Sequence, residues 1–493
     1  MPHPRQWNRL RRLPAAELRQ LLDANLARYV REELYPFSTH YRRVMDEAGV
    51  APRDIRGVAD LRRLPFTTKQ DLLAIQSDPE RKLDLVLRPA PATIKAHWPF
   101  ARKLGLVLGG QRARDLVAYR YTPNFLTFTT GRSTAPVAFA YTPHDLEVLG
   151  EATARMFDLA RITDMRERVV NLFPFAPHLA FWALTLGGFH TGRLVVPTGG
   201  GKVMGTEGSL RLMERIRPTA LVGTPGFVYH LLRTGAASGF DFSTVHTIVL
   251  GAEKVTPGLK SKMREHLARG GAREVQILGT YGFTEARMAF TEAPTSDGTS
   301  TGYYVHPDLG VFEVVDPATG EPVAEGESGE LVYTGASGHG TVVVRYRTGD
   351  LAEGGITWAP HPGVDCTLPR ISASLKRVTE QHALNLTKLK GTLVDLAVMG
   401  QVLSDEHDVE EWQVVLSKQD DDPYGLDRIE LRIAPRAGAD GEGLARALSA
   451  KLLAACEVSP NAVHLHSVDE MLGFLGMESQ MKEQRFLDRR PKE

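Results

Sequence analysis

Apolar positions in the middle of the chain come in short runs, each closed by Gly, Pro or Thr. From Val169 onward these runs are VVNLF, RLVVP, ALVGTP, TIVLGA and VQILGTYG, and stretches with helical spacing lie between them. Short apolar runs that alternate with helices are typical of buried strands in a parallel or mixed sheet with crossover helices. This region therefore predicts an α/β core.

The regions on either side follow other patterns. Leu18, Leu22 and Leu26 recur near one face of residues 15–33, which predicts a helix in a helical cap. Between Gly302 and Val344, the runs VFEVVD, GELVYTG and TVVVRY are separated by turn residues and predict a small antiparallel sheet. After Arg370, two helix-like stretches, strands at WQVVL and DRIELRIA, and a helix over residues 442–456 predict a small α+β domain.

Composition narrows the class of protein. The 493 residues carry 59 Lys+Arg and 59 Asp+Glu, so no charge imbalance points to nucleic acid or to an anionic membrane. A chain of this length exceeds the roughly 250–300 residues of a single core, which predicts at least two domains. Cys366 and Cys456 are too few for a disulfide scaffold. The most apolar stretch, Leu179–Phe189, is shorter than a membrane span and predicts a buried element. We expect a cytoplasmic protein.

The first segment with candidate chemistry is TFTTGRSTAP, residues 127–136. Gly131 would let the backbone approach anionic oxygens, while Thr129 and Thr130 supply hydroxyl donors and Arg132 a positive charge. These are the properties of a loop that binds nucleotide phosphates. A polar surface turn would have the same composition.

Three later motifs stand at or near the ends of predicted strands. GAE (residues 251–253) follows the run TIVL, and GTYGFTE (residues 279–285) follows VQIL. Ligand sites of open α/β sheets lie at the carboxyl ends of strands. The third motif, YRTGDL (residues 346–351), is predicted to present the Asp350 carboxylate in a tight turn. Each motif alone is also compatible with an ordinary loop.

The order TTGRSTAP, GAE, YGFTE and YRTGD, followed by an arginine and a C-terminal lysine, resembles the adenylate-forming superfamily. The segment IRGVADLRRLPFTTKQDL, residues 55–72, is similar to the N-terminal signature of its phenylacetate–CoA ligase branch. The resemblance covers residues 41–490. It implies a large multi-sheet α/β adenylation domain over residues 1–369, a hinge at 370–372 and a small mobile α+β lid over 373–493.

The resemblance also implies roles for single residues. Thr284 would meet the α-phosphate, Glu285 would bind Mg²⁺, and Lys482 would bridge the acid's carboxylate and the α-phosphate during adenylation. Glu253 would lie near the adenine edge and Tyr281 against the ring, while Asp350 and Arg370 would hold the ribose. The implied ATP-binding residues are Thr129, Thr130, Gly131, Gly251, Ala252, Glu253, Tyr281, Gly282, Asp350 and Arg370. The implied acid pocket contains Phe173, Phe175, His178 and Trp182.

The function implied by the resemblance has two stages. A small, aromatic acid is activated by Mg·ATP as an acyl-adenylate with release of pyrophosphate, and the acyl group then passes to CoA after rotation of the lid. One alternative is transfer to another acceptor, such as a carrier protein, or activation of nitrite for diazotisation of an arylamine. An alternative of another class is an inactive subunit that binds nucleotide or acyl groups. A homodimer is left open.

Two segments differ from the family pattern. The phosphate loop has Phe128 in place of a common glycine and carries Arg132, Ser133 and Thr134 as an insertion. The hinge has Ser372 where relatives usually have an acidic residue, with extra residues before Gly391. The first difference bears on the grip on phosphate, and the second bears on transfer to CoA.

Overall fold

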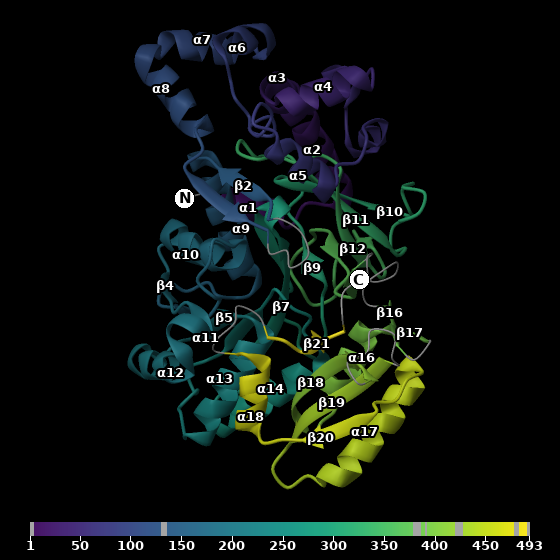
Figure 1. Ribbon diagram of the computed structural model, residues 1–493. Helices are drawn as coiled ribbons and strands as arrows, with labels where there is room; N and C mark the ends of the chain where they lie inside the picture. Colours follow the sequence, from purple (N-terminus) through teal and green to yellow (C-terminus); the bar gives the residue numbers. More distant parts are fainter. Residues whose placement is uncertain are drawn as a thin grey trace. The chain divides into compact units, whose positions relative to one another are not determined.

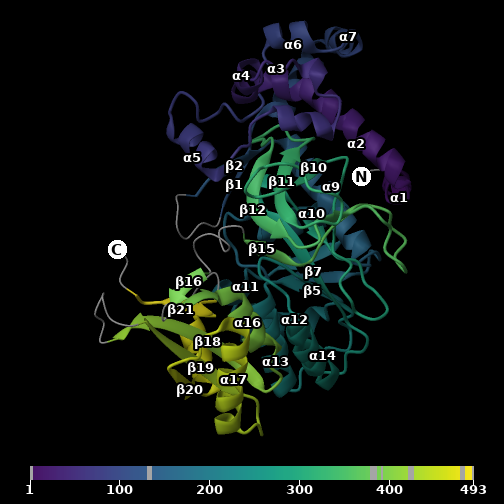
Figure 2. The ribbon, with the colours of Figure 1, turned by 90° about the vertical axis from the view of Figure 1, so that its right-hand side faces the viewer.

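The computed structural model describes residues 4–129, 136–377, 386–389, 392–419, 427–477 and 483–490. The chain divides into two compact units (Figures 1 and 2). The first comprises Met1–Val169, Phe175–Pro197 and Gln276–Lys376, and the second Val170–Pro174, Thr198–Val275 and Arg377–Glu493.

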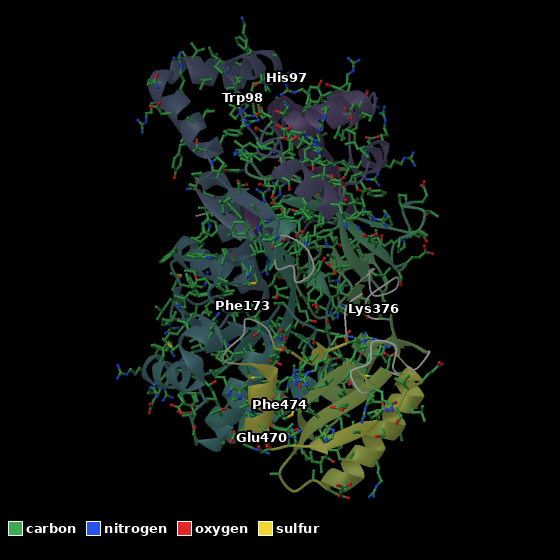
Figure 3. All side chains as sticks on the ribbon, viewed as in Figure 1. His97, Trp98, Phe173, Lys376, Glu470 and Phe474 are labelled. Atoms are coloured by element: carbon green, nitrogen blue, oxygen red, sulfur yellow. The ribbon has the colours of Figure 1, made fainter. Side chains whose placement is uncertain are left out.

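Helices dominate the N-terminal part of the first unit. The predicted helix over residues 15–33 is confirmed as α2, which buries Leu18, Leu22 and Leu26 and continues into a π-helical turn at Val30–Leu34. Trp98, at the end of α6 (Figure 3), packs edge-on against Phe37 with 5.9 Å between ring centroids. The helices here are α1 (Pro4–Leu10), α2 (Ala15–Tyr29), α3 (Tyr35–Phe37), α4 (Thr39–Glu47), α5 (Lys69–Ser77), α6 (Pro91–His97), α7 (Phe100–Leu108) and α8 (Gly110–Tyr121).

The first unit contains a run of antiparallel strands in the order β13-β14-β9-β8-β7. The apolar segment 179–189 forms most of helix α10, which buries Leu179, Phe181 and Leu184 but leaves Phe189 exposed. Among the described residues, no helix is long and apolar enough to cross a membrane. The elements are β7 (Gln276–Phe283), β8 (Met288–Thr291), β9 (Tyr303–Tyr304), β13 (Ile356–Thr357), β14 (Arg370–Ile371), α9 (Pro143–Leu159), α10 (Leu179–Thr191) and β4 (Leu194–Pro197). Strand β3 (Arg168–Asn171) has two residues in each unit.

A second, four-stranded sheet has the order β10-β11-β12-β15. The runs VFEVVD and GELVYTG are confirmed as strands, but the strand predicted at TVVVRY is wrong. Val342, Val343 and Val344 are buried in the apolar core without joining a ladder, and the strand begins only at Tyr346. The strands of this sheet are β10 (Gly310–Val315), β11 (Gly329–Gly335), β12 (Tyr346–Ala352) and β15 (Leu375–Arg377). A separate two-stranded sheet consists of β1 (Phe125–Phe128) and β2 (Ala138–Tyr141).

The second unit begins with a parallel pair of strands, in which Ala220 of β5 lies opposite Thr247 of β6. Both strands are buried along their whole length, as their continuous apolar runs predict. The elements are α11 (Gly200–Val203), α12 (Gly205–Ile216), β5 (Ala220–Gly223), α13 (Pro225–Ala237), β6 (Thr247–Leu250) and α14 (Pro257–Arg269).

The C-terminal part of the second unit is α+β, as predicted, with a sheet in the order β20-β19-β18-β21. Strands at WQVVL and DRIELRIA and the helix near residues 442–456 are confirmed. Of the two helix-like stretches after Arg370, one is α16, while residues 386–389 and 392–395 form two antiparallel strands instead. The elements are β16 (Leu386–Leu389), β17 (Thr392–Asp395), α16 (Leu396–Asp405), β18 (Val409–Lys418), β19 (Asp427–Pro435), α17 (Gly441–Cys456), β20 (Ala462–Leu465), α18 (Val468–Leu475) and β21 (Phe486–Asp488).

A buried ion pair joins the start of α9 to the turn between β7 and β8. Arg287 Nη1 lies 2.6 Å from Asp145 Oδ1, and the same carboxylate accepts hydrogen bonds from the N–H groups of Thr142, His339 and Gly340. Burial raises the pKa of Asp145, but Arg287 and these backbone donors outweigh burial and hold the pKa below its usual value. Asp145 is therefore a charged anchor for the chain that follows β7.

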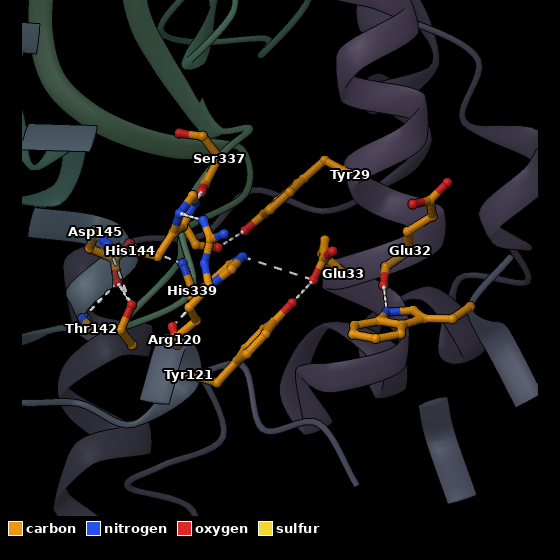
Figure 4. Close-up of polar contacts among 12 residues, drawn as sticks. Tyr29, Glu32, Glu33, Arg120, Tyr121, Thr142, His144, Asp145, Ser337 and His339 are labelled. Atoms are coloured by element: carbon orange, nitrogen blue, oxygen red, sulfur yellow. Dashed lines mark hydrogen bonds and ion pairs between the residues drawn. The ribbon is translucent and has the colours of Figure 1, made fainter. Parts of the chain in front are cut away.

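Next to this anchor, aromatic rings form a short stack (Figure 4). His339 stacks between Tyr121 and His144, with 4.0 Å between centroids on each side. The Tyr121 hydroxyl donates to Glu33, so the stack connects α8, α9 and the helical cap. Burial lowers the pKa of His339 to about 3, which keeps its ring neutral.

We predict that Asp145→Asn destabilises the first unit, because Arg287 would remain buried without its counter-ion. Loss of one partner of a buried pair costs roughly 3–5 kcal/mol in the free energy of unfolding. Urea denaturation of the variant measures this loss. The matched control is Asp164→Asn, whose carboxylate pairs with Arg166 on the surface. This control should keep the wild-type midpoint, and an equal loss in both variants would contradict the anchoring role.

Candidate active site

Tyr281 and Asp350 come from separate motifs and meet in the first unit. The Tyr281 hydroxyl on β7 donates to Asp350 Oδ2 on β12 at 2.8 Å. Its ring lies among aromatic neighbours, with centroids 5.4 Å from Phe283 and 6.0 Å from Tyr303. The structure therefore brings together Tyr281, for which a contact with adenine is predicted, and Asp350, for which a contact with ribose is predicted.

Asp350 lies within strand β12, so the prediction of a tight turn at YRTGD is wrong. The pairing of β11 with β12 shifts between Glu330 and Val332, which marks a β-bulge. Within the bulge, Gly349 has φ 73°, and the Asp350 N–H donates to Thr348 Oγ1 at 3.1 Å. A bulge re-aims the side chain next to it, and only glycine adopts this φ without strain. The glycine of the motif is thus required by the geometry that presents Asp350.

Glu285 occupies a short helical turn (Thr284–Ala286) directly after β7. Its side chain is largely buried, and Oε1 accepts a hydrogen bond from the Tyr346 hydroxyl at 2.7 Å. The next residue but one, Arg287, has φ 58° and forms the ion pair with Asp145. The anchor therefore fixes the backbone beside both Thr284, which is partly exposed, and Glu285.

The donor set at Glu285 fits Mg²⁺ that is shared with phosphates. Within the described part of the chain, no group of three or more His, Cys, Asp or Glu side chains could hold a metal ion. Mg²⁺ keeps several waters and binds through one or two carboxylates plus substrate phosphates, so a dedicated cluster is not needed. A single carboxylate supported by a neutral phenol suits such a site.

Arg370 is held by backbone groups. Its guanidinium donates to the carbonyl oxygens of Thr301 at 2.6 Å and Ala359 at 2.9 Å. Its contact with ribose stays a prediction.

The strand beside β12 is β15, which sequence analysis missed, and its Lys376 (Figure 3) pairs with Glu353 at 2.5 Å. The basic pair at residues 376–377 is the signal that could have drawn attention to this strand.

Of the three residues predicted to bind the phosphates, Thr129, Thr130 and Gly131, only Thr129 lies within the described chain. Thr129 closes the β1–β2 hairpin, since its hydroxyl accepts from the Val137 N–H at 2.9 Å and its N–H donates to the Val137 carbonyl. Thr130, Gly131 and Lys482 lie outside the described residues.

The predicted acid-pocket residues of the first unit gather at the start of α10. His178 Nδ1 donates to the Phe128 carbonyl oxygen at 3.0 Å, and the Trp182 indole N–H donates to a backbone carbonyl. The Trp182 ring lies 6.0 Å from Phe175 and 5.2 Å from Phe125, centroid to centroid. These side chains form an aromatic group beside the β1–β2 hairpin. Phe173 is buried and belongs to the second unit.

The GAE motif belongs to the second unit and follows β6, as predicted. The Gly251 N–H donates to the Gly223 carbonyl at the end of β5. Ala252 has φ 71°, a left-handed conformation that costs a non-glycine residue roughly 1–2 kcal/mol. Such strain is retained where the surrounding structure and a function require it. Glu253 follows this strained residue directly.

Comparison with known proteins agrees with the fold and the motif order. The AMP-binding enzyme family matches residues 144–341. The chain is 31% identical over 345 residues to phenylacetate–coenzyme A ligase of Thermus thermophilus, covering 69% of this chain and 67% of the relative. The Escherichia coli K12 enzyme of the same name is 26% identical over 341 residues, covering 67% and 66%.

A solved structure, 2-hydroxyisobutyryl-CoA ligase in the postadenylation state with R3-HIB-AMP, has the same fold. Its TM-score is 0.73 at 19% identity, covering 98% of this chain and 92% of that one. The family match and the similar ligases define the class, an AMP-binding enzyme that is an AMP-forming acid–CoA ligase. Within that class, the chain belongs to the phenylacetate–coenzyme A ligase family.

We predict that Gly349→Ala weakens binding of Mg·ATP about tenfold, equivalent to roughly 1.4 kcal/mol, because alanine strains the bulge and displaces Asp350. Isothermal titration calorimetry measures the affinity. Gly363→Ala is the matched control, since Gly363 also has a left-handed φ, of 81°, with open space around its Cβ position. An equal loss of affinity in both variants would show that backbone strain alone, and not Asp350, is responsible.

Proposed function

We propose that this enzyme activates a small aromatic acid as an acyl-adenylate, with Mg·ATP as co-substrate, and transfers the acyl group to CoA. The observation that carries the proposal is a reciprocal pairing of two motifs. Tyr281 of YGFTE donates to Asp350 of YRTGD, and Tyr346 of YRTGD donates to Glu285 of YGFTE. The two carboxylates are thereby fixed by the same pair of strands.

Each carboxylate has a distinct role in the proposal. Asp350 accepts hydrogen bonds from the ribose hydroxyls, and the Tyr281 ring lies against adenine. Glu285 would hold Mg²⁺, and the metal would supply positive charge to neutralise the departing pyrophosphate. Thr284 donates its hydroxyl to the α-phosphate. The acid's carboxylate then attacks the α-phosphorus, the bond to the bridging oxygen of pyrophosphate breaks, and acyl-AMP remains.

Two observations support the choice of substrates. The group of Phe175, His178 and Trp182 offers flat apolar surfaces with one imidazole, which suits an aromatic acid. CoA as the acceptor is supported by the phenylacetate–coenzyme A ligases to which the chain is similar. Use of ATP and the two buried cysteines, which form no disulfide with each other, fit a cytoplasmic setting.

The test measures AMP and pyrophosphate release from Mg·ATP with a panel of aryl acids, aliphatic acids, and nitrite plus arylamines, each with and without CoA. We expect acid-dependent release with an aryl acid, and AMP turnover that requires CoA. Turnover only with nitrite and an amine, or adenylation indifferent to CoA, would support transfer to another acceptor. ATP binding without turnover on any acid would favour a binding subunit.

We predict that Lys482→Ala slows adenylation by roughly 10²–10³-fold, because one charge donor to the transition state is lost. Acid-dependent ATP–pyrophosphate exchange measures this step. Lys451→Ala is the matched control, since Lys451 pairs with Glu406 on the surface of the same unit. Normal exchange in the Lys482 variant would contradict its catalytic role.

A further inference from the structure

Helices α7 and α8 stand apart from the sheets of the first unit. In both ribbon views, α6 and α7 lie at one end of this unit, away from its strands (Figures 1 and 2). Helix α7 has no buried side chain, and in α8 only Tyr121 is buried. We call α7 and α8 together, residues 100–121, the helical arm.

One face of α7 consists of large apolar side chains that are exposed. Their spacing of i, i+4, i+7 and i+8 places them within an arc of about 100° around the helix. Single exposed apolar side chains are common on protein surfaces, whereas a contiguous group of them marks an interaction surface. The exposed fractions are 75% for Phe100, 43% for Leu104, 70% for Val107 and 78% for Leu108.

Contacts on the opposite side of α7 hold this face outward. Arg102 pairs with Glu32 at 3.1 Å and with Glu33 at 2.7 Å. Its guanidinium also lies over the Trp98 ring (Figure 3), 4.0 Å from the ring centroid. Leu106 packs against the apolar core of the first unit. At about 100° per residue, Arg102 and Leu106 lie opposite the apolar face, so the exposure of that face is fixed by the fold.

The helical arm is also basic. Arg112 and Arg114 are exposed, and neither pairs with an acidic side chain of the described residues. Lys103 stands four residues before Val107 and therefore borders the apolar face. Because Lys+Arg and Asp+Glu are equal over the whole chain, this positive charge is a local feature. Against one acidic residue, Asp115, the arm carries Arg102, Lys103, Arg112, Arg114 and Arg120.

We propose that the helical arm docks on the surface of an anionic phospholipid membrane. A helix at a membrane surface buries its apolar face below the headgroups, while Lys and Arg side chains attract the anionic lipids. Tyrosine is enriched at the depth of the headgroups, and Tyr119 of α8 is exposed. Such a helix lies in the plane of the bilayer, so docking needs no helix that spans it. The arm contains none of the residues of the candidate active site.

A second copy of the chain suits this face less well than a membrane. A helix of nine residues is roughly 14 Å long and covers on the order of 100 Å², against about 800 Å² per partner in a stable protein interface. Two identical arms would also bring like charges together, which opposes association. A protein groove would need a shape that matches α7. A lipid surface needs only the exposed apolar face and the positive charge that the arm has.

The first test is co-sedimentation of the full-length protein with vesicles. Vesicles of equal parts phosphatidylcholine and phosphatidylglycerol are compared with vesicles of phosphatidylcholine alone. We expect about tenfold or greater preference for the anionic vesicles, because each basic residue near the surface adds attraction. Added salt should weaken binding, since it screens these charges. No binding to the anionic vesicles, or equal binding to both, would overturn the proposal.

The second test removes part of the apolar face with the double variant Val107→Gln, Leu108→Gln. Both side chains are exposed, so the variant should fold normally and bind anionic vesicles about tenfold less tightly, because apolar burial is lost. The matched control is Val203→Gln, Leu453→Gln, which removes two exposed apolar side chains from helices of the second unit. Wild-type binding by the arm variant, or equal losses in both, would contradict docking through α7.

The third test removes charge with the double variant Arg112→Gln, Arg114→Gln. We expect about tenfold weaker binding to anionic vesicles and a smaller dependence on salt. Arg166→Gln, Arg211→Gln is the matched control, since it removes the same charge from two exposed sites outside the arm. Equal weakening by both variants would assign binding to the net charge of the protein and overturn the role of the arm.

The last test reports contact with the lipid directly. Phe100→Trp places an indole on the apolar face, and lipids with brominated acyl chains should quench its fluorescence. Leu453→Trp is the control and should not be quenched. Equal quenching in both, or none in the arm variant, would overturn the proposal. Self-association that is lost in the Val107, Leu108 variant, without vesicle binding, would assign the face to a second copy instead. None of these measurements needs an acid or ATP, so their outcome is independent of the proposed function.

Discussion

Two tyrosine–carboxylate hydrogen bonds are the constraint on which the candidate site depends. Asp350 and Glu285 are both largely buried, and a buried carboxylate is costly unless it is hydrogen-bonded. In each case one partner is a neutral phenol, at 2.8 Å and 2.7 Å. A phenol reduces the cost of burial without bringing an opposite charge, as an arginine would.

The geometry of these bonds comes from the scaffold around them. The bulge at Gly349 turns Asp350 toward Tyr281, and the buried pair of Arg287 with Asp145 fixes the turn that carries Glu285. The ion pair of Arg287 with Asp145 holds the backbone, and the two tyrosine hydroxyls orient the carboxylates of the candidate site.

The sequence predicted several strands of the fold, but it missed the features that depend on pairing between strands distant in the chain. Continuous apolar runs predicted β5 and β6, because strands buried on both faces need no alternation. Motif order predicted nucleotide-binding roles for Tyr281 and Asp350; these roles stay predictions, and the structure joins the two residues by a hydrogen bond. The valines at 342–344 resembled a strand, yet they pack in the core without a ladder. Nothing local distinguishes these cases, since a bulge or a ladder exists only when its partner strand is in register.

In the second unit, too, one set of interactions provides stability and another fixes the positions of the elements. The C-terminal sheet has its own apolar core, which includes Trp412, Val414 and Leu431, and this burial favours its folding. The charges of Arg233 and Glu411 add little net stability, because desolvation offsets their attraction. Mismatching them would be expensive, however, since it would leave a buried charge unpaired. This buried pair therefore selects one arrangement of β18 on α13. Gly226 of α13, against which the Glu483 carboxylate lies, restricts the arrangement further.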